Sequence, residues 1–334
     1  MASLQSTLSL TRRRVVPLNI CMLALLVAAA VACGPNLQWT IYTRADDIGG
    51  NDIHDVFIGD DGLVWVATYG GKGASVFDGK TFRLFTEEDG LAHQNVNHID
   101  VDSKGNAWFA TDDLGISRFD GSEWTTYTTE DGLAHNRVLS SIVDPDGDLW
   151  VGTVEGLSRF DGSTWTTFTE EDGLAGNNIR SLAIDDQDNL WVGSGTENGG
   201  LTVYDGATWR TYHTDDGLVS DNVRFVTFDP QGILWIGTLG GLSSFDGTTF
   251  TNLKSRDGLA SNFVLQIAFD SRGRIWLTAG RSGVTVIDGD EIKTYELKEG
   301  PFGHNISTVA VGPDDRKWVG TMVGGLRMLG EDQP

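Results

Sequence analysis

Cysteine, basic residues and long apolar runs are all scarce in this chain, and each shortage excludes a class of protein. Only two cysteines occur, Cys21 and Cys33, so we expect neither a disulfide framework nor a thiolate zinc cluster. Lys and Arg number 24 against 47 Asp and Glu, a formal net charge of -23. Such an acidic surface repels nucleic acid and anionic membranes and favours a soluble monomer. An apolar core must therefore hold the fold, and no nucleic-acid partner is expected.

The amino-terminal apolar run is too short to cross a bilayer comfortably. It covers residues 20–32 and follows three arginines at 12–14, which is the pattern of a secretory signal. Its end, Ala30-Val31-Ala32-Cys33-Gly34, resembles the lipobox of bacterial lipoproteins, although Ala30 stands where Leu is usual. The resemblance implies cleavage before Cys33, lipidation of its thiol and a lipid anchor as the only membrane contact. Ordinary secretion, with cleavage after residues 28–30, is the alternative.

One unit of about forty residues recurs seven times. Each copy ends in a tripeptide such as Phe77-Asp78-Gly79, and the corresponding glycines are 41 to 44 residues apart. Every copy contains four strand-like runs; in the third these are residues 137–144, 149–153, 156–160 and 164–168. This period and strand content predict an all-β fold, a seven-bladed β-propeller of four-stranded antiparallel blades.

The strand count also predicts how the ring closes. Only six outer strands follow the seven inner ones, and the missing pattern stands first in the chain, at residues 39–43 (Trp39-Thr40-Ile41-Tyr42-Thr43). We expect this strand to complete the last blade beside residues 325–329, because closure removes exposed sheet edges. The expected domains are a signal peptide (1–32), a lipidated linker (33–37), the propeller (38–330) and a tail (331–334).

The second strand of each copy carries a tryptophan, usually with a small residue two positions later. These tryptophans are Trp65, Trp108, Trp150, Trp191, Trp235, Trp276 and Trp318. Both faces of this strand are apolar, so each blade must be packed between two others. The small residue is expected to leave a slot for the neighbouring blade.

The repeats resemble those of the two-component regulator propeller family. Its units read W-x-x-Y/F, E-D-G-L, V-x-x-I, D-x-x-G-x-L-W-V-G-T and G-L-x-x-F-D-G, and the likeness covers residues 39–330. The resemblance implies an extracytoplasmic sensor region in the bacterial cell envelope that binds oligosaccharides or related ligands. No kinase sequence lies within these residues, so we expect a separate membrane signalling or transport protein to act as partner.

An acidic turn recurs between the units, as TEEDGLA at residues 86–92 and 169–175 and as variants elsewhere. Calcium or carboxylate sites would explain it, but a joint needed between successive blades explains its repetition better. Glycine can adopt positive φ there, the preceding Asp can cap the turn, and Leu can pack between blades. The calcium-like run 144–148 is interpreted as a hairpin, because Leu149 stands where a calcium loop needs glycine.

Polar residues that vary between copies follow this turn, where the inner strand begins. Amides and arginines in such a ring can bind hydroxyls and carboxylates, which suggests an oligosaccharide or another anionic polyol as ligand. The alternative is that the amides satisfy backbone groups and the arginines pair with acidic loops; both interpretations stay open here. The candidate ligand-binding residues are Arg137, Arg180, Arg224, Asn95, Asn136, Asn177, Asn222 and His54.

No catalytic or metal constellation can be singled out. The histidines at 54, 93, 98, 135 and 304 come from consecutive blades but differ in depth along their strands, so no metal site and no cofactor is expected. The turn at 158–165 resembles the Asp-box of sialidase-type propellers, and the D-x-x-G-x-L-W turns resemble those of streptogramin-lyase propellers. A protein-interaction scaffold and a polysaccharide lyase or glycoside hydrolase are therefore the alternatives to a ligand-binding sensor.

Overall fold

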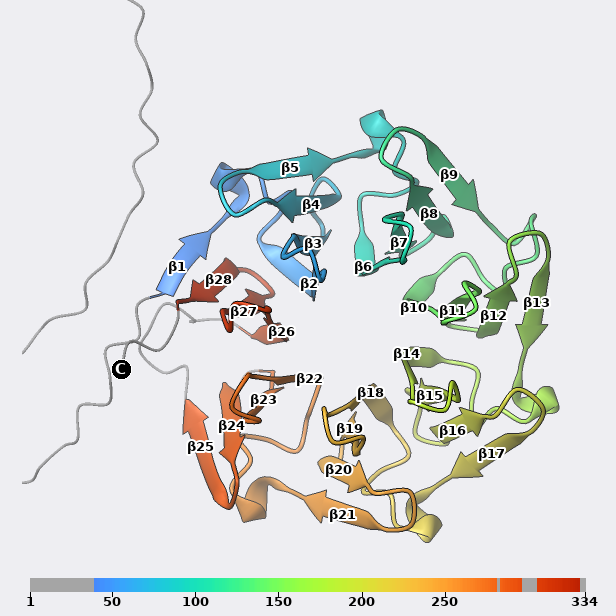
Figure 1. Ribbon diagram of the computed structural model, residues 1–334, viewed down its shortest axis with the longest axis vertical. Coiled ribbons are helices and arrows are strands. Elements are labelled where there is room, and N and C mark those ends of the chain that lie inside the picture. Colours follow the sequence, from blue (N-terminus) through green and yellow to red (C-terminus); the bar gives the residue numbers. More distant parts are fainter. Residues whose placement is uncertain (1–38, 281–282, 296–304, 331–334) are drawn as a thin grey trace, which may run out of the picture.

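Seven four-stranded antiparallel sheets surround one axis, which confirms the seven-bladed propeller predicted from the repeats (Figure 1). The computed structural model describes residues 39–280, 283–295 and 305–330. The expected signal, the linker with Cys33, His304 and the tail 331–334 lie outside these residues. Within the described ranges, no helix is both long and apolar enough to span a membrane.

The strands of blades one to six run outward from the axis in chain order, and in blade seven β26, β27 and β28 are followed outward by β1. The innermost are β2 (Asp52–Ile58), β6 (Val96–Val101), β10 (Val138–Val143), β14 (Ile179–Ile184), β18 (Val223–Phe228), β22 (Gln266–Phe269) and β26 (Ile306–Val311). The second strands are β3 (Val64–Tyr69), β7 (Ala107–Thr111), β11 (Leu149–Thr153), β15 (Leu190–Ser194), β19 (Leu234–Thr238), β23 (Ile275–Thr278) and β27 (Lys317–Thr321). The third are β4 (Ala74–Phe77), β8 (Ile116–Phe119), β12 (Gly156–Phe160), β16 (Gly200–Tyr204), β20 (Leu242–Phe245), β24 (Val284–Asp288) and β28 (Gly325–Leu329). The outermost are β1 (Trp39–Tyr42), β5 (Phe82–Phe85), β9 (Trp124–Tyr127), β13 (Trp165–Phe168), β17 (Trp209–Tyr212), β21 (Phe250–Leu253) and β25 (Glu291–Tyr295).

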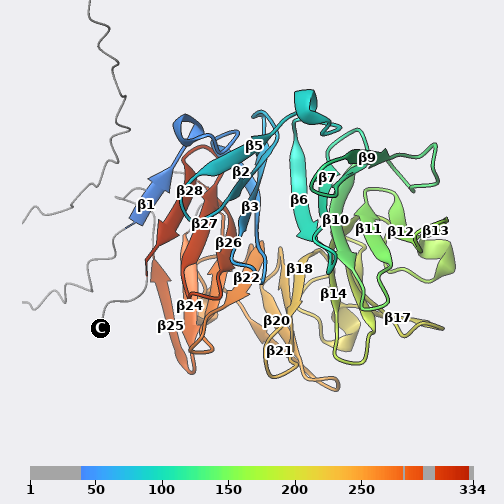
Figure 2. The same cartoon turned by 45° about the horizontal axis from the view of Figure 1, so that its top comes forward.

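The first strand closes the ring as the strand count predicted. β1 pairs antiparallel with β28, from Trp39 opposite Leu329 to Tyr42 opposite Leu326 (Figure 2). The ring of Tyr42 stacks on Trp318 of the last blade, with centroids 5.9 Å apart, and also contacts Phe77 of the first blade at 5.4 Å. The two ends of the ring are thus joined by both a hydrogen-bonded ladder and aromatic packing.

Small residues in the second strands admit the next blade, although the group that enters is aliphatic. A Cβ on Gly152 would lie 2.7 Å from Cγ2 of Ile179, and one on Gly193 would lie 2.7 Å from Cγ1 of Val223. Both branched residues begin the inner strand of the following blade. A larger residue at either glycine would therefore force adjacent blades apart.

An aspartate six residues before the tryptophan fixes the indole in five blades, a link that the sequence interpretation missed. Its Oδ2 accepts a hydrogen bond from the tryptophan Nε1 at 2.8–3.3 Å, and the pairs are Asp102–Trp108, Asp144–Trp150, Asp185–Trp191, Asp229–Trp235 and Asp270–Trp276. Oδ1 of Asp144 also accepts from the backbone of Asp148, which confirms a hairpin at 144–148. Blades one and seven have Gly59 and Gly312 at this position.

The acidic turns are joints between blades, as predicted. Most contain one turn of 3-10 helix: η1 (Arg44–Asp46), η2 (Glu87–Asp89), η3 (Glu170–Asp172), η4 (Thr214–Asp216) and η5 (Ser255–Asp257). In η3, Oδ2 of Asp172 accepts from the backbone N–H of Thr169 at 2.8 Å. Gly173 follows with φ of 119°, and Leu174 is buried between blades. The joint thus satisfies its own backbone and positions the next inner strand.

Deletion of residues 34–44 should destabilise the entire ring. It removes the β1–β28 ladder and the packing of Trp39 and Tyr42, at about 1.5–3 kcal/mol for each aromatic side chain. Since about 1 kcal/mol corresponds to roughly 2–4 °C in a domain of this size, we expect the Tm to fall by about 10 °C or more. Circular dichroism melting would measure this, with Thr40→Ala on the exposed face of the same strand as control. An unchanged melting curve for the deletion would refute closure by this strand.

Candidate functional site

The candidate residues gather at the end of the blades where the inner strands begin. In most blades the pairing between the first and second strands has a β-bulge near the start of the inner strand, where one residue is left unpaired. The residues left out of the ladder are His54, Asn97, Leu139, Arg180, Arg224 and Ser307. A bulge of this kind re-aims the side chain of the extra residue. Three predicted site residues, His54, Arg180 and Arg224, therefore occupy the same structural position in different blades.

Arg180 and Arg224 are half-buried cations that have no carboxylate partner among the residues that the structure describes. Nε of Arg180 donates to Oδ1 of Asn178 at 2.8 Å, and Arg180 fits because Gly195 has no side chain. Nε of Arg224 has no hydrogen-bond partner in the described structure. Burial, together with the positive charges of Arg224 and Arg137, lowers the pKa of Arg180 to about 10. Burial also lowers the pKa of Arg224. The two guanidinium groups therefore lie close enough to repel each other.

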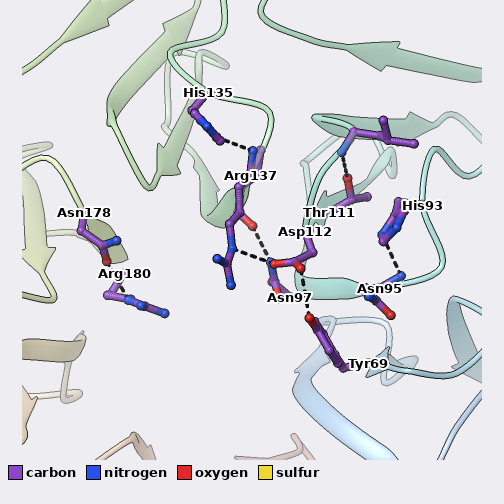
Figure 3. A network of polar contacts seen from close by, with 12 residues as sticks. Tyr69, His93, Asn95, Asn97, Thr111, Asp112, His135, Arg137, Asn178 and Arg180 are labelled. Atoms are coloured by element: carbon purple, nitrogen blue, oxygen red, sulfur yellow. Dashed lines mark hydrogen bonds and ion pairs between the residues drawn. The ribbon is translucent and has the colours of Figure 1, made fainter.

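Arg137, by contrast, belongs to a polar network that links blades one to three (Figure 3). Its Nε lies 2.8 Å from Oδ1 of Asp112, and its side chain remains 48% exposed. Oδ2 of Asp112 accepts from the hydroxyl of Tyr69 at 3.1 Å, and this bond raises the pKa of Tyr69. Asn97 donates from Nδ2 to the carbonyl oxygen of Val138 at 2.8 Å. Arg137 is therefore oriented by the acidic partner that the other two arginines lack.

The sequence interpretation missed Tyr69 and Asp112, but a signal for them exists. Both stand four residues after the tryptophan of their blade, where the other copies have Val154, Gly195, Leu239, Gly280 and Met322. A polar or aromatic residue at this normally apolar position marks the two blades as different. Tyr69 also stacks on His54, with ring centroids 4.7 Å apart and an interplanar angle of 13°.

Three of the predicted amides have backbone partners. Oδ1 of Asn136 accepts from the N–H of Thr129 at 2.8 Å, and Oδ1 of Asn177 accepts from Glu170 at 2.9 Å, so each caps an acidic joint. Oδ1 of Asn95 accepts from Gly70 of the preceding blade at 2.8 Å. Oδ1 of Asn222 is buried with no partner in the described part of the chain. Of the four amides, Asn222 has the side-chain oxygen available to another group.

The histidines serve separate local functions. Nδ1 of His93 accepts from the backbone N–H of Asn95 at 3.2 Å, and Nδ1 of His135 accepts from the backbone N–H of Arg137 at 2.8 Å. Among residues 39–280, 283–295 and 305–330, no group of three His, Cys, Asp or Glu side chains could hold a metal ion.

An ion pair between a partly buried histidine and a buried aspartate crosses the inner wall deeper in the ring. Nδ1 of His98 lies 2.7 Å from Oδ2 of Asp55 in the first blade. Its Nε2 lies 3.1 Å from the carbonyl oxygen of Ser141 in the third blade, and a carbonyl can only accept. Burial opposes the imidazolium, but the Asp55 carboxylate outweighs it and raises the pKa of His98. One protonated ring thereby links three blades.

This pair should make stability depend on pH. An imidazolium with a raised folded-state pKa stabilises the fold below its unfolded pKa, and the contribution is lost as pH rises through the folded value. Burial raises the pKa of Asp100 to about 6, so the free energy of unfolding also falls as the pH rises from about 4 to 6. Urea unfolding of the native protein should therefore show declining stability from pH 5 to 9. His98→Gln should flatten the upper part of this decline and Asp100→Asn the lower part; unchanged slopes in both variants would contradict the assignment.

The capping role of Asn177 predicts a stability effect. Asn177→Ala removes the acceptor for the N–H of Glu170 and should lower the free energy of unfolding by about 1 kcal/mol, as for other turn caps. Asn178→Ala is the matched control, because Oδ1 of Asn178 accepts from a side chain, Arg180. Equal losses in the two variants by urea unfolding would argue against the cap.

Comparison with known proteins identifies the repeats. The family described as "Two component regulator propeller" matches at residues 132–155, 173–196 and 217–240, which contain Arg137, Arg180 and Arg224. No curated protein matches the sequence.

Several solved structures share the fold. The extracellular domain of BT3049, a proposed hybrid two-component system of B. thetaiotaomicron, superposes with a TM-score of 0.74 at 21% identity, covering 89% of this chain and 41% of that one. This chain thus spans about two fifths of that domain. Virginiamycin B lyase of Staphylococcus aureus, solved with quinupristin, gives 0.72 at 14% identity and coverage of 88% and 98%. YCF48 bound to the D1 peptide gives 0.65 at 16% identity and coverage of 91% and 97%.

These three structures are similar to this chain in fold alone, because their sequence identities are low. A match in repeat sequence points to one family more specifically than a shared fold does. The protein is therefore a seven-bladed β-propeller, three of whose repeats match the two-component regulator propeller family.

Proposed function

We propose that this protein is an extracytoplasmic sensing propeller that captures an anionic polyol, such as an acidic oligosaccharide, at the start of its inner strands. One observation carries the proposal: Arg180 and Arg224, on adjacent blades, are half-buried and have no carboxylate partner among the described residues. The chain has a net charge of -23, so acidic partners were plentiful. Their absence at these two arginines favours a site kept free for an external anion.

The chemistry of the site fits a carboxylate or sulfate group beside hydroxyls. A guanidinium offers a planar pair of donors that matches a carboxylate, and half-burial strengthens the resulting bonds. An anion between Arg180 and Arg224 would also relieve their mutual repulsion.

Residues of blades one and three would complete the site. The exposed guanidinium of Arg137 offers a third cation, and the stacked rings of His54 and Tyr69 offer a flat face for the apolar side of a sugar. We assign Asn95, Asn136 and Asn177 to positioning the inner strands, since their oxygens hold backbone groups. Ligand contact would then fall mainly on arginines and aromatic rings.

The cellular context follows from the repeat family and the leader sequence. Two-component regulator propeller repeats and the extracellular neighbours support a position outside the cytoplasm. Lipidation at Cys33 would anchor the protein in the bacterial envelope, where a separate membrane signalling or transport protein would receive the signal.

Calorimetric titration with trigalacturonate tests the proposal, with the neutral trisaccharide maltotriose for comparison. The native protein should bind the acidic sugar preferentially. Arg180→Gln with Arg224→Gln should weaken binding by about tenfold or more, since hydrogen bonds to charged groups contribute roughly 1.5–3 kcal/mol. The same double variant should keep or raise the unliganded Tm, because two repelling, half-buried charges are gone.

Arg83→Gln with Arg210→Gln is the matched control, because it makes the same charge change on outer strands. Equal weakening of trigalacturonate binding in both double variants would show that overall charge, and not the arginine site, causes the effect. Absence of binding by the native protein to trigalacturonate and to sulfated sugars would overturn the proposal. Release of an unsaturated, ultraviolet-absorbing product would support the lyase alternative instead.

A further inference from the structure

A second candidate site lies at the opposite end of the blades, between blades seven and one. A cavity of about 250 Å³ opens there beside the hairpins that join first and second strands. Its apolar wall includes Ile58, Val64 and Phe77 of the first blade and Trp318 of the seventh. This location is the seam that β1 and β28 close, and the cavity shares no residue with the arginine site.

The cavity exists where the repeat loses its aspartate. Gly312 lines the cavity and occupies the position that holds the indole-binding aspartate in five other blades. The hairpin is otherwise retained, since the N–H of Gly312 still donates to the carbonyl oxygen of Arg316 at 2.9 Å, as Asp270 does to Arg274 at 3.0 Å. The missing carboxylate therefore leaves space without changing the backbone around it.

One of the two roles of that aspartate is left unfilled. In other blades Oδ1 accepts from the hairpin backbone, and in blade seven Oδ1 of Asp314 does so, from the N–H of Arg316 at 3.1 Å. The second role, accepting from the indole, has no substitute: no described residue accepts from Nε1 of Trp318. Trp318 is 2% exposed and lines the cavity. Nε1 of Trp318 is therefore a donor without a partner in the described part of the protein that is open to the cavity, where an external acceptor could bind it.

The charged lining of the cavity is mostly acidic. Asp60, Asp61 and Asp314 line it, and the one cation among the lining residues, Arg316, is paired with Asp314 at 3.2 Å between Nε and Oδ2. A bound anion would face uncompensated carboxylates, whereas an ammonium or guanidinium group would pair with Asp60 and Asp61. The aromatic rings of Phe77 and Trp318 also favour a cationic group with a carbon body.

We propose that this cavity binds a small organic cation that carries a hydrogen-bond acceptor, such as a basic amino-acid amide. The cationic group would pair with Asp60 and Asp61, and a carbonyl or hydroxyl oxygen would accept from Nε1 of Trp318. The volume limits the ligand to about the size of one amino-acid side chain with its backbone, because it lies below the roughly 300–1,000 Å³ of drug-sized pockets.

Titration with L-argininamide tests this proposal, and L-citrullinamide, whose side chain is neutral, serves as the matched ligand. The native protein should bind L-argininamide more tightly and show a Tm that rises with its concentration. Gly312→Asp with Asp314→Gln copies the hairpin of blade five, where Asp229 and Gln231 stand. It supplies the indole with its own acceptor and fills the cavity, so binding should be lost while the unliganded Tm holds or rises.

The acidic surface makes non-specific cation binding the main competing explanation. Asp60→Asn with Asp61→Asn should weaken binding by about tenfold or more. Asp146→Asn with Asp186→Asn makes the same charge change at the hairpins of blades three and four and should leave binding unchanged. Equal weakening in both pairs, retained binding in the Gly312→Asp/Asp314→Gln variant, or no binding by the native protein would overturn the proposal.

Discussion

Each blade is apolar on both faces, and the rest of the structure depends on the packing that this imposes. The second strand places an indole and a small residue side by side, and the branched residue that begins the next blade fills the gap, as Ile179 does at Gly152. A blade with two buried faces requires two neighbours, so the array must close on itself. The pairing of β1 with β28 and the repeated joints both follow from this requirement.

Because packing fixes so many positions in every copy, the positions that depart from the repeat are the informative ones. The bulge residue of the inner strand contacts no ladder partner and varies from His54 to Leu139 to Arg180. The aspartate that binds the indole is essential to five hairpins and absent from two. The two candidate sites that result have opposite charge. Arg180 and Arg224 lie at one end of blades four and five, whereas Asp60 and Asp61 lie at the opposite end of the molecule, between blades seven and one.

The same fold occurs in an extracellular domain of a proposed sensor, in an antibiotic lyase and in a peptide-bound protein. Fold alone therefore does not select a function, and the case for ligand capture rests on the side chains. Arg137 shows why partners matter: its Nε is held by Asp112, although the side chain remains 48% exposed. Arg180 and Arg224 have no such carboxylate among the described residues; burial lowers the pKa of both, and the nearby positive charges lower that of Arg180 further.

The sequence by itself determined the seven blades, the order of strands, the closing strand at Trp39 and the joint at each Gly-Leu pair. Repetition made this possible, because a pattern seen seven times reports on packing that every copy shares. Only the tertiary structure decided which polar residues are free. Asn178 and Asn222 occupy the same position of the repeat, yet Oδ1 of Asn178 accepts from Arg180 and Oδ1 of Asn222 has no partner in the described structure. The ion pair of His98 with Asp55 likewise involves two blades, and the cavity at Gly312 is lined by residues of two blades. Such contacts depend on the distance between neighbouring strands in the closed ring, which no local pattern encodes.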